Sequence, residues 1–160
     1  MQPVEPKIDH HSMSSARRLG GLYTIGLMVL LLLFFAIHQR QNTGFFTDKF
    51  GIPEMVALYL PILTSMAAPL LRLIQGRNDP ARLAELVSDL CVAVGSLWLW
   101  EIFPFNFARI GNVFPATIHF VFTWLNDSIG RIILLLQIII GFISALATAG
   151  SYLTERRMKQ

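Results

Sequence analysis

Four polar residues interrupt the longest apolar runs of the sequence and are the first candidates for chemistry: Asp89, Glu101, Arg131 and Gln137. An ionisable side chain inside such a run is costly to bury, so it usually has a function or a partner. Asp89 would bind a cation or relay a proton, or it would pair with Arg72 or Arg82. The neutral amide of Gln137 suits a hydrogen bond between two helices.

The spacing of these residues does not assemble a recognisable catalytic or transport site. Asp89 lies near the beginning of its apolar run, whereas Glu101 lies at the end of the same run, beside Trp100. Glu101 is placed to pair with Arg109 or Arg131. A proton path needs acids at several depths, so transport is an alternative interpretation and not the leading one.

The sequence lacks the motifs of enzymes that work inside membranes. An intramembrane protease needs a Ser–His pair or two aspartates in its spans, or a zinc-binding HExxH sequence. Of the histidines, His10 and His11 lie in a polar tail, and His38 and His119 lie at the ends of apolar runs or between them. We therefore expect no catalytic residue, no metal site and no cofactor, and we do not expect an enzyme.

Composition and run length predict a membrane protein. Of the 160 residues, 54% are hydrophobic and 14% are charged, whereas about 25% are charged in a typical soluble domain. Four apolar runs are each long enough to cross a hydrocarbon core of about 30 Å as a helix. They cover residues 20–38, 52–73, 83–103 and 129–153. The predicted fold is therefore all-α, a four-helix transmembrane bundle.

The domain organisation follows from these runs. Residues 1–19 form a polar tail that we expect to be mobile, residues 20–153 form the transmembrane domain, and residues 154–160 form a basic tail. Pro61 and Pro69 lie inside the second run and predict a kink, because proline removes a backbone donor from a helix.

The segment between the third and fourth runs, residues 104–125, is aromatic and is broken by Pro104, Gly111 and Pro115. Its apolar part, residues 116–125, is too short to span a bilayer. We expect an interfacial or re-entrant segment, for which lipid binding is a third and weaker functional interpretation. A fifth crossing is the structural alternative, and it would move the C-terminus to the other side.

The basic residues favour one orientation of the four runs. Nine lysines and arginines flank one side of the predicted membrane and four flank the other. Basic residues concentrate on the cytoplasmic side, so both termini are predicted to be cytoplasmic. The net charge of +3 is then explained by basic residues that set the orientation in the membrane and contact anionic lipid headgroups, and not by binding of nucleic acid. The richer side holds Lys7, Arg17, Arg18, Arg72, Arg77, Arg82, Arg156, Arg157 and Lys159, and the other Arg40, Lys49, Arg109 and Arg131.

Small residues recur at helical spacing in two of the runs. Gly141, Ala145 and Ala149 are four residues apart in the fourth run, and Cys91 and Gly95 are four apart in the third. This spacing lets two helices approach closely. We interpret both stripes as packing inside the bundle, with contact to a second copy or to another membrane subunit as the alternative. The first run, rich in Leu, Val and Phe, is expected to face lipid on most sides.

Two segments in the last third of the chain form a pattern, FPFNF at residues 103–107 and WLNDSIGRI at residues 124–132. The pattern resembles one in small multi-pass membrane proteins of bacteria that have no assigned activity. With this resemblance we expect the chain to lie in the bacterial inner membrane, which is the plasma membrane of the cell. The resemblance transfers no catalytic residue.

Two functional interpretations follow. The leading one is a small membrane protein that works through contacts, as an accessory, assembly or oligomeric interaction protein. The alternative is a channel or transporter for ions or small solutes, based on Asp89 and the kinked second run. The expected partners are the lipid bilayer and either a second copy or another membrane subunit, with no nucleic acid.

Overall fold

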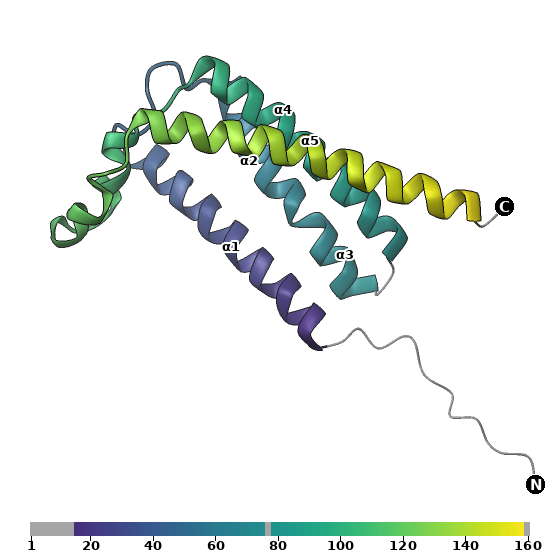
Figure 1. Cartoon of the computed structure of the whole chain (residues 1–160). Helices are drawn as coiled ribbons and strands as arrows, with labels where there is room; N and C mark the ends of the chain where they lie inside the picture. The colour runs from purple at the N-terminus through teal and green to yellow at the C-terminus, as the bar shows by residue number, and fades with distance from the viewer. Residues whose placement is uncertain (1–14, 76–77, 159–160) are drawn as a thin grey trace, which may run out of the picture.

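The computed structural model describes residues 15–75 and 78–158, and this part of the chain is built from helices (Figure 1). The predicted all-α fold is confirmed there. The α-helices are α1 (Ser15–Arg40), α2 (Ile52–Ser65), α3 (Ala67–Gln75), α4 (Asn78–Ile102) and α5 (Asp127–Met158), and the 3-10 helices are η1 (Phe107–Val113) and η2 (Ala116–Phe122).

Four stretches of these helices are apolar and long enough to cross a membrane, as predicted: Leu19–Arg40, Ile52–Ile74, Pro80–Ile102 and Asp127–Ser151. The chain is therefore a multi-pass membrane protein with a four-helix bundle. Helix α1 begins and helix α5 ends inside the segments that were predicted as tails, 1–19 and 154–160. The remainder of both tails lies outside the described residues.

The second span is interrupted between α2 and α3, near its two inner prolines. Because Pro69 has no N–H to donate to the Ser65 carbonyl oxygen, the helical ladder cannot continue there. The Met66 N–H instead bonds the Leu63 carbonyl oxygen at 3.2 Å, which closes a tighter turn. The Ser65 hydroxyl donates to the Pro61 carbonyl oxygen at 2.7 Å. This side-chain bond supports the backbone at the interruption.

The start of α2 is fixed by a buried carboxylate. Glu54, which is only 7% exposed, accepts a hydrogen bond from the Gly51 backbone N–H at 2.9 Å. Its other oxygen accepts from the Trp98 indole N–H on α4 at 3.1 Å. Glu54 therefore both caps its own helix and ties α2 to α4.

Helix α4 lies between α2 and α5, and glycines bring the three helices together. An added Cβ at Gly95 of α4 would lie 2.6 Å from the Ala57 carbonyl oxygen of α2. An added Cβ at Gly141 of α5 would lie 3.0 Å from the Ala93 nitrogen of α4. These two glycines therefore lie at contacts between helices inside the bundle, where a side chain would hold the helices apart.

The links between α1 and α2 and between α4 and α5 meet at one end of the bundle, which we call the aromatic end (Figure 1). Phe46 and Phe105 form an antiparallel β-bridge across the two links. The Asn106 N–H donates to the Phe45 carbonyl oxygen at 2.7 Å. The rings that pack between the links are Phe45, Phe46, Phe50, Phe103, Phe105 and Phe107.

Residues 104–125 do not make a fifth crossing. They contain the two short 3-10 helices η1 and η2, which extend beyond the end of α1 in Figure 1. The opposite end of the bundle holds the start of α1, the start of α4 and the end of α5 (Figure 1). We call it the basic end, because it corresponds to the predicted side with nine lysines and arginines.

The two segments FPFNF and WLNDSIGRI touch each other at the aromatic end. The Phe107 N–H donates to an Asp127 carboxylate oxygen at 2.8 Å. The Arg131 guanidinium lies 4.2 Å from the centre of the Phe103 ring. The Phe107 ring also fills the space beside Gly130, where a Cβ would overlap it. These contacts join the end of α4 to the start of α5.

Candidate functional site

Helix α1 is the least integrated element of the bundle. No residue in the most apolar stretch of its span is buried (0%), and the helix packs mainly against α2 and α3. We predicted from the sequence that this run faces lipid on most sides, and the exposed surface of α1 leaves room for such contacts. The space beside α1 contains two adjoining pockets, which we describe in turn and together call the α1 groove.

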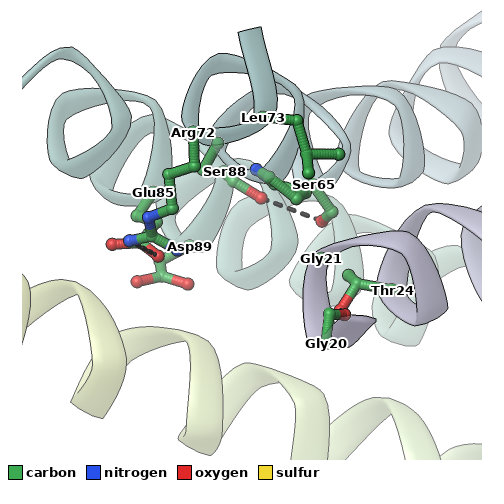
Figure 2. Close-up of a pocket in the computed structure, with 11 residues that line it drawn as sticks. Gly20, Gly21, Thr24, Ser65, Arg72, Leu73, Glu85, Ser88 and Asp89 are labelled. Carbon is green, nitrogen blue, oxygen red and sulfur yellow. Dashed lines mark hydrogen bonds and ion pairs between the residues drawn. The ribbon is translucent and has the colours of Figure 1, made fainter. Parts of the chain in front are cut away.

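The first pocket, called the inner pocket, lies between the start of α1 and the α3–α4 pair, towards the basic end (Figure 2). Its volume is about 420 Å³. Gly20 of α1 helps to open it, because nothing lies within 4 Å of where its Cβ would be. The pocket is lined by Gly20, Gly21, Thr24, Ser65, Ala68, Pro69, Arg72, Leu73, Glu85, Ser88 and Asp89.

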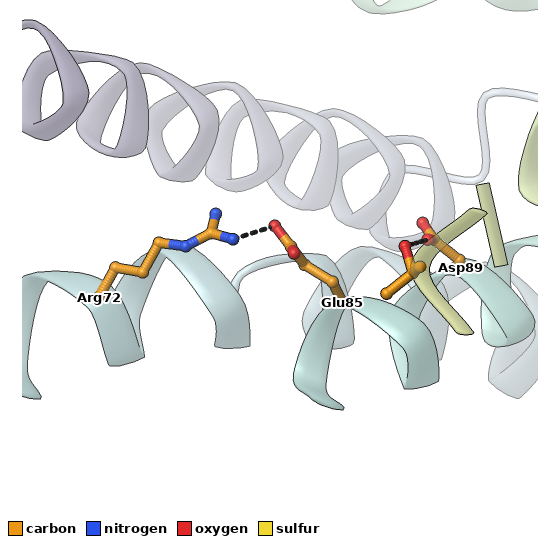
Figure 3. Close-up of polar contacts among 4 residues, drawn as sticks. Arg72, Glu85 and Asp89 are labelled. Carbon is orange, nitrogen blue, oxygen red and sulfur yellow. Dashed lines mark hydrogen bonds and ion pairs between the residues drawn. The ribbon is translucent and has the colours of Figure 1, made fainter. Parts of the chain in front are cut away.

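Polar side chains cover one wall of the inner pocket. Arg72 of α3 forms an ion pair with Glu85 of α4 at 2.5 Å (Figure 3). The Ser65 and Ser88 hydroxyls share a hydrogen bond of 2.9 Å (Figure 2). Both charged side chains of the ion pair are about a third exposed, at 31% and 36%. A ligand in the pocket can therefore reach them.

Asp89 lies one helical turn beyond Glu85 on the same wall. Its carboxylate accepts a hydrogen bond from the Thr148 hydroxyl of α5 at 3.4 Å (Figure 3). Arg72 pairs with Glu85, so the pairing of Arg72 with Asp89 considered from the sequence is not the one observed. The described residues of this wall thus bring the guanidinium of Arg72 and the carboxylates of Glu85 and Asp89 to the pocket.

The second pocket, called the aromatic pocket, continues the groove towards the aromatic end and has a volume of about 360 Å³. Ser65 lines both pockets, so they adjoin there. The walls are mainly aliphatic and aromatic. They include Met28, Leu31, Phe34 and Phe35 of α1, Ile62 of α2, Val92 and Leu99 of α4, and Ile133 and Leu134 of α5.

One polar pair interrupts these apolar walls. The Ser96 hydroxyl of α4 donates to the Gln137 side-chain oxygen of α5 at 3.4 Å. This is the bond between helices that suits an amide in a span. Both residues line the aromatic pocket.

The structure brings two of the four polar candidates to the groove, Asp89 in the inner pocket and Gln137 in the aromatic pocket. Glu101 is exposed at the end of α4. Arg131, a partner considered for Glu101, lies over Phe103 and donates to the Trp100 carbonyl oxygen at 3.4 Å. Glu101 and Arg131 therefore belong to the aromatic end and not to the groove.

The predicted packing residues have different surroundings. Ala145 is buried and Ala149 is half-buried on α5. Cys91 is a free, half-buried thiol. It lines an apolar hollow between α2 and α4 together with Gly95.

Thr24 and Glu85 were not singled out from the sequence, Ser65 and Ser88 were not expected to line a pocket, and Arg72 was considered only as a partner of Asp89. The hydroxyl residues gave a weak signal, because Ser and Thr are ordinary in transmembrane helices. The Arg72–Glu85 pair depends on how the chain turns between α3 and α4, and no sequence spacing fixes that turn. Within residues 15–75 and 78–158, no group of three or more His, Cys, Asp or Glu side chains is placed to hold a metal ion.

Comparison with known proteins adds no family: no family model, curated protein or solved structure matches this chain.

Proposed function

We propose that this membrane protein is an accessory protein without catalytic activity, and that it works by holding another membrane component in the α1 groove. The observation that carries this proposal is the groove itself. One helix stands partly away from the bundle, and polar side chains line the space that it leaves within the spans.

The physical support is the cost of polar groups in a hydrocarbon environment. Lipid tails offer no hydrogen-bond partners, so polar side chains that face them are unfavourable. Asp89, Glu85 and Arg72 all line the groove in the spans or at their ends. A bound component with complementary polar groups relieves this cost, and its apolar part covers the walls of the aromatic pocket.

Self-association has less support than binding of a different component. Gly95 and Gly141, the two glycines of the predicted small-residue stripes, are already in contact with neighbouring helices of the same chain.

A channel or transporter for ions or small solutes also has less support. Asp89 and the polar wall favour entry of an ion from the basic end. Beyond Ser65, however, the walls are mainly apolar, and the packed phenylalanines follow at the aromatic end. An ion would lose its hydration there without replacement ligands.

The test is the mass of the intact assembly after purification in native nanodiscs. We expect a defined component to remain bound at a fixed ratio to the chain. A bare monomer would contradict the proposal. Flux in proteoliposomes that exceeds empty liposomes and is lost in Asp89→Asn would replace the proposal with the transport alternative.

We further propose that the protein lies in the bacterial inner membrane with the basic end and both termini in the cytoplasm. The excess of basic residues on that side, nine against four, supports this orientation. In a Cys91→Ser background, Asn42→Cys should react with a membrane-impermeant maleimide in spheroplasts with intact inner membranes, because Asn42 is exposed in the α1–α2 link. Lys159→Cys should react only after permeabilisation. The reverse pattern would invert the orientation.

A further inference from the structure

We propose that the component held in the α1 groove is a phospholipid with a primary amine in its head group. The head would lie in the inner pocket and an acyl chain in the aromatic pocket. This inference rests on the proposed function and names its ligand class.

The groove changes from polar to apolar from the basic end towards the aromatic end of the bundle, as a lipid does from head group to acyl chain. Thr24, Ser65 and Ser88 bring hydroxyls to the inner pocket beside the three charged side chains. The aromatic pocket beyond Ser65 is lined mostly by aliphatic and aromatic side chains. The same molecule would thus satisfy both pockets only if it had a polar end at the basic end and an apolar end in the bilayer interior.

The volumes favour a lipid chain over a transmembrane helix of a partner. A helix about 10 Å across that spans about 30 Å of hydrocarbon occupies roughly 2,400 Å³. The two pockets offer about 420 Å³ and 360 Å³, which lie in the range of about 300–1,000 Å³ typical of small-molecule sites. A partner helix could cover the mouth of the groove but could not enter it.

The charges select the head group. Among the described residues that line the inner pocket, the charged groups are the carboxylates of Glu85 and Asp89 and the guanidinium of Arg72. Two carboxylates oppose a purely anionic head and favour an ammonium group. Arg72 contacts Glu85 through one of its terminal nitrogens and has further N–H donors for a phosphate oxygen. A head group that carries both a phosphate and a primary amine matches both kinds of charge, because the phosphate can bind the guanidinium and the ammonium can bind a carboxylate.

A primary ammonium group also fits better than a quaternary one. It carries three N–H donors, which the carboxylate of Asp89 and the hydroxyls of Ser65 and Ser88 can accept. A trimethylated amine has the same charge but donates no N–H bond, and its usual site is an aromatic cage. None of the described residues that line the inner pocket is aromatic.

Native mass spectrometry of the detergent-purified full chain tests this inference. The probes are phosphatidylethanolamine, phosphatidylcholine and phosphatidylglycerol with identical acyl chains. We expect phosphatidylethanolamine to bind about tenfold more tightly than the other two, the effect of one charge-assisted hydrogen bond. Asp89→Asn should remove most of this preference. Glu101→Gln, which changes an exposed carboxylate outside the groove, should keep it.

A second pair of variants tests the place of binding without changing a charge. Thr24→Trp would fill the inner pocket from α1, and it should abolish the bound lipid. Tyr23→Trp places the same ring on the neighbouring residue, which is 74% exposed, and should leave binding unchanged.

The outcomes separate this inference from the proposed function. Equal binding of the three lipids, unchanged in Asp89→Asn and Thr24→Trp, would overturn the aminolipid. If a different component remained bound in nanodiscs at a fixed ratio, the accessory function would still stand. If nothing remained bound under either condition, both would fail.

Discussion

Gly130→Ala is expected to destabilise the protein by about 1–3 kcal/mol, the usual cost of forcing extra atoms into a packed site. A Cβ at Gly130 would overlap the ring of Phe107. The ring cannot easily withdraw, because it packs against the rings of Phe45, Phe103 and Phe105. The melting temperature in a fixed detergent should therefore fall.

Gly26→Ala is the matched control, since nothing lies within 4 Å of a Cβ at Gly26. Alanine there should leave the melting temperature unchanged or raise it, because alanine favours helix over glycine by about 1 kcal/mol. Adding Phe107→Leu to Gly130→Ala should recover part of the loss by removing the ring. Equal melting temperatures for Gly130→Ala and Gly26→Ala would contradict the packing of the aromatic end.

Gly95→Ala is expected to weaken the contact between α2 and α4. Its Cβ would lie 2.6 Å from the Ala57 carbonyl oxygen and 2.9 Å from the Pro61 ring. The first of these is backbone, so relief requires α2 to move away from α4 and not a side chain to rotate. We expect a loss of about 1–3 kcal/mol, measured as the midpoint of unfolding in mixed micelles of increasing SDS fraction.

The same movement should strain the hydrogen bond between Trp98 and Glu54, which joins the same two helices about one helical turn away from this contact. Gly26→Ala again provides the control for the glycine-to-alanine change. An unfolding midpoint for Gly95→Ala at or above that of the control would show that α2 and α4 do not cross at this glycine.

The parts of the fold that follow from local pattern were predictable from the sequence. Each span is a run of apolar residues of sufficient length, and the interruption between α2 and α3 follows from the missing donor of Pro69. The folding of the aromatic segment 104–125 into two short 3-10 helices was less predictable. Its short apolar part argued against a span and left a fifth crossing as the alternative, and its proline and glycine positions did not specify a conformation.

The groove was only partly predictable, because it depends on contacts between distant residues. Asp89 and Gln137 were evident as polar groups in apolar runs. The packing of α1 mainly against α2 and α3 was not evident, since a run rich in Leu and Val packs equally well against lipid or protein. Gly130 was also missed. Its role depends on Phe107, which lies in another segment and approaches only when both links fold over the bundle end.

Photo-crosslinking in native membranes tests most directly whether the α1 groove holds a bound component. A diazirine-bearing amino acid of similar size would replace Leu31, which lines the aromatic pocket, or the adjacent Leu30, which is 64% exposed to the surroundings of the bundle. We expect the variant at Leu31 to give one discrete adduct mass and the variant at Leu30 to give the mixture of bulk lipids. The same bulk mixture at both positions would contradict a bound component in the groove.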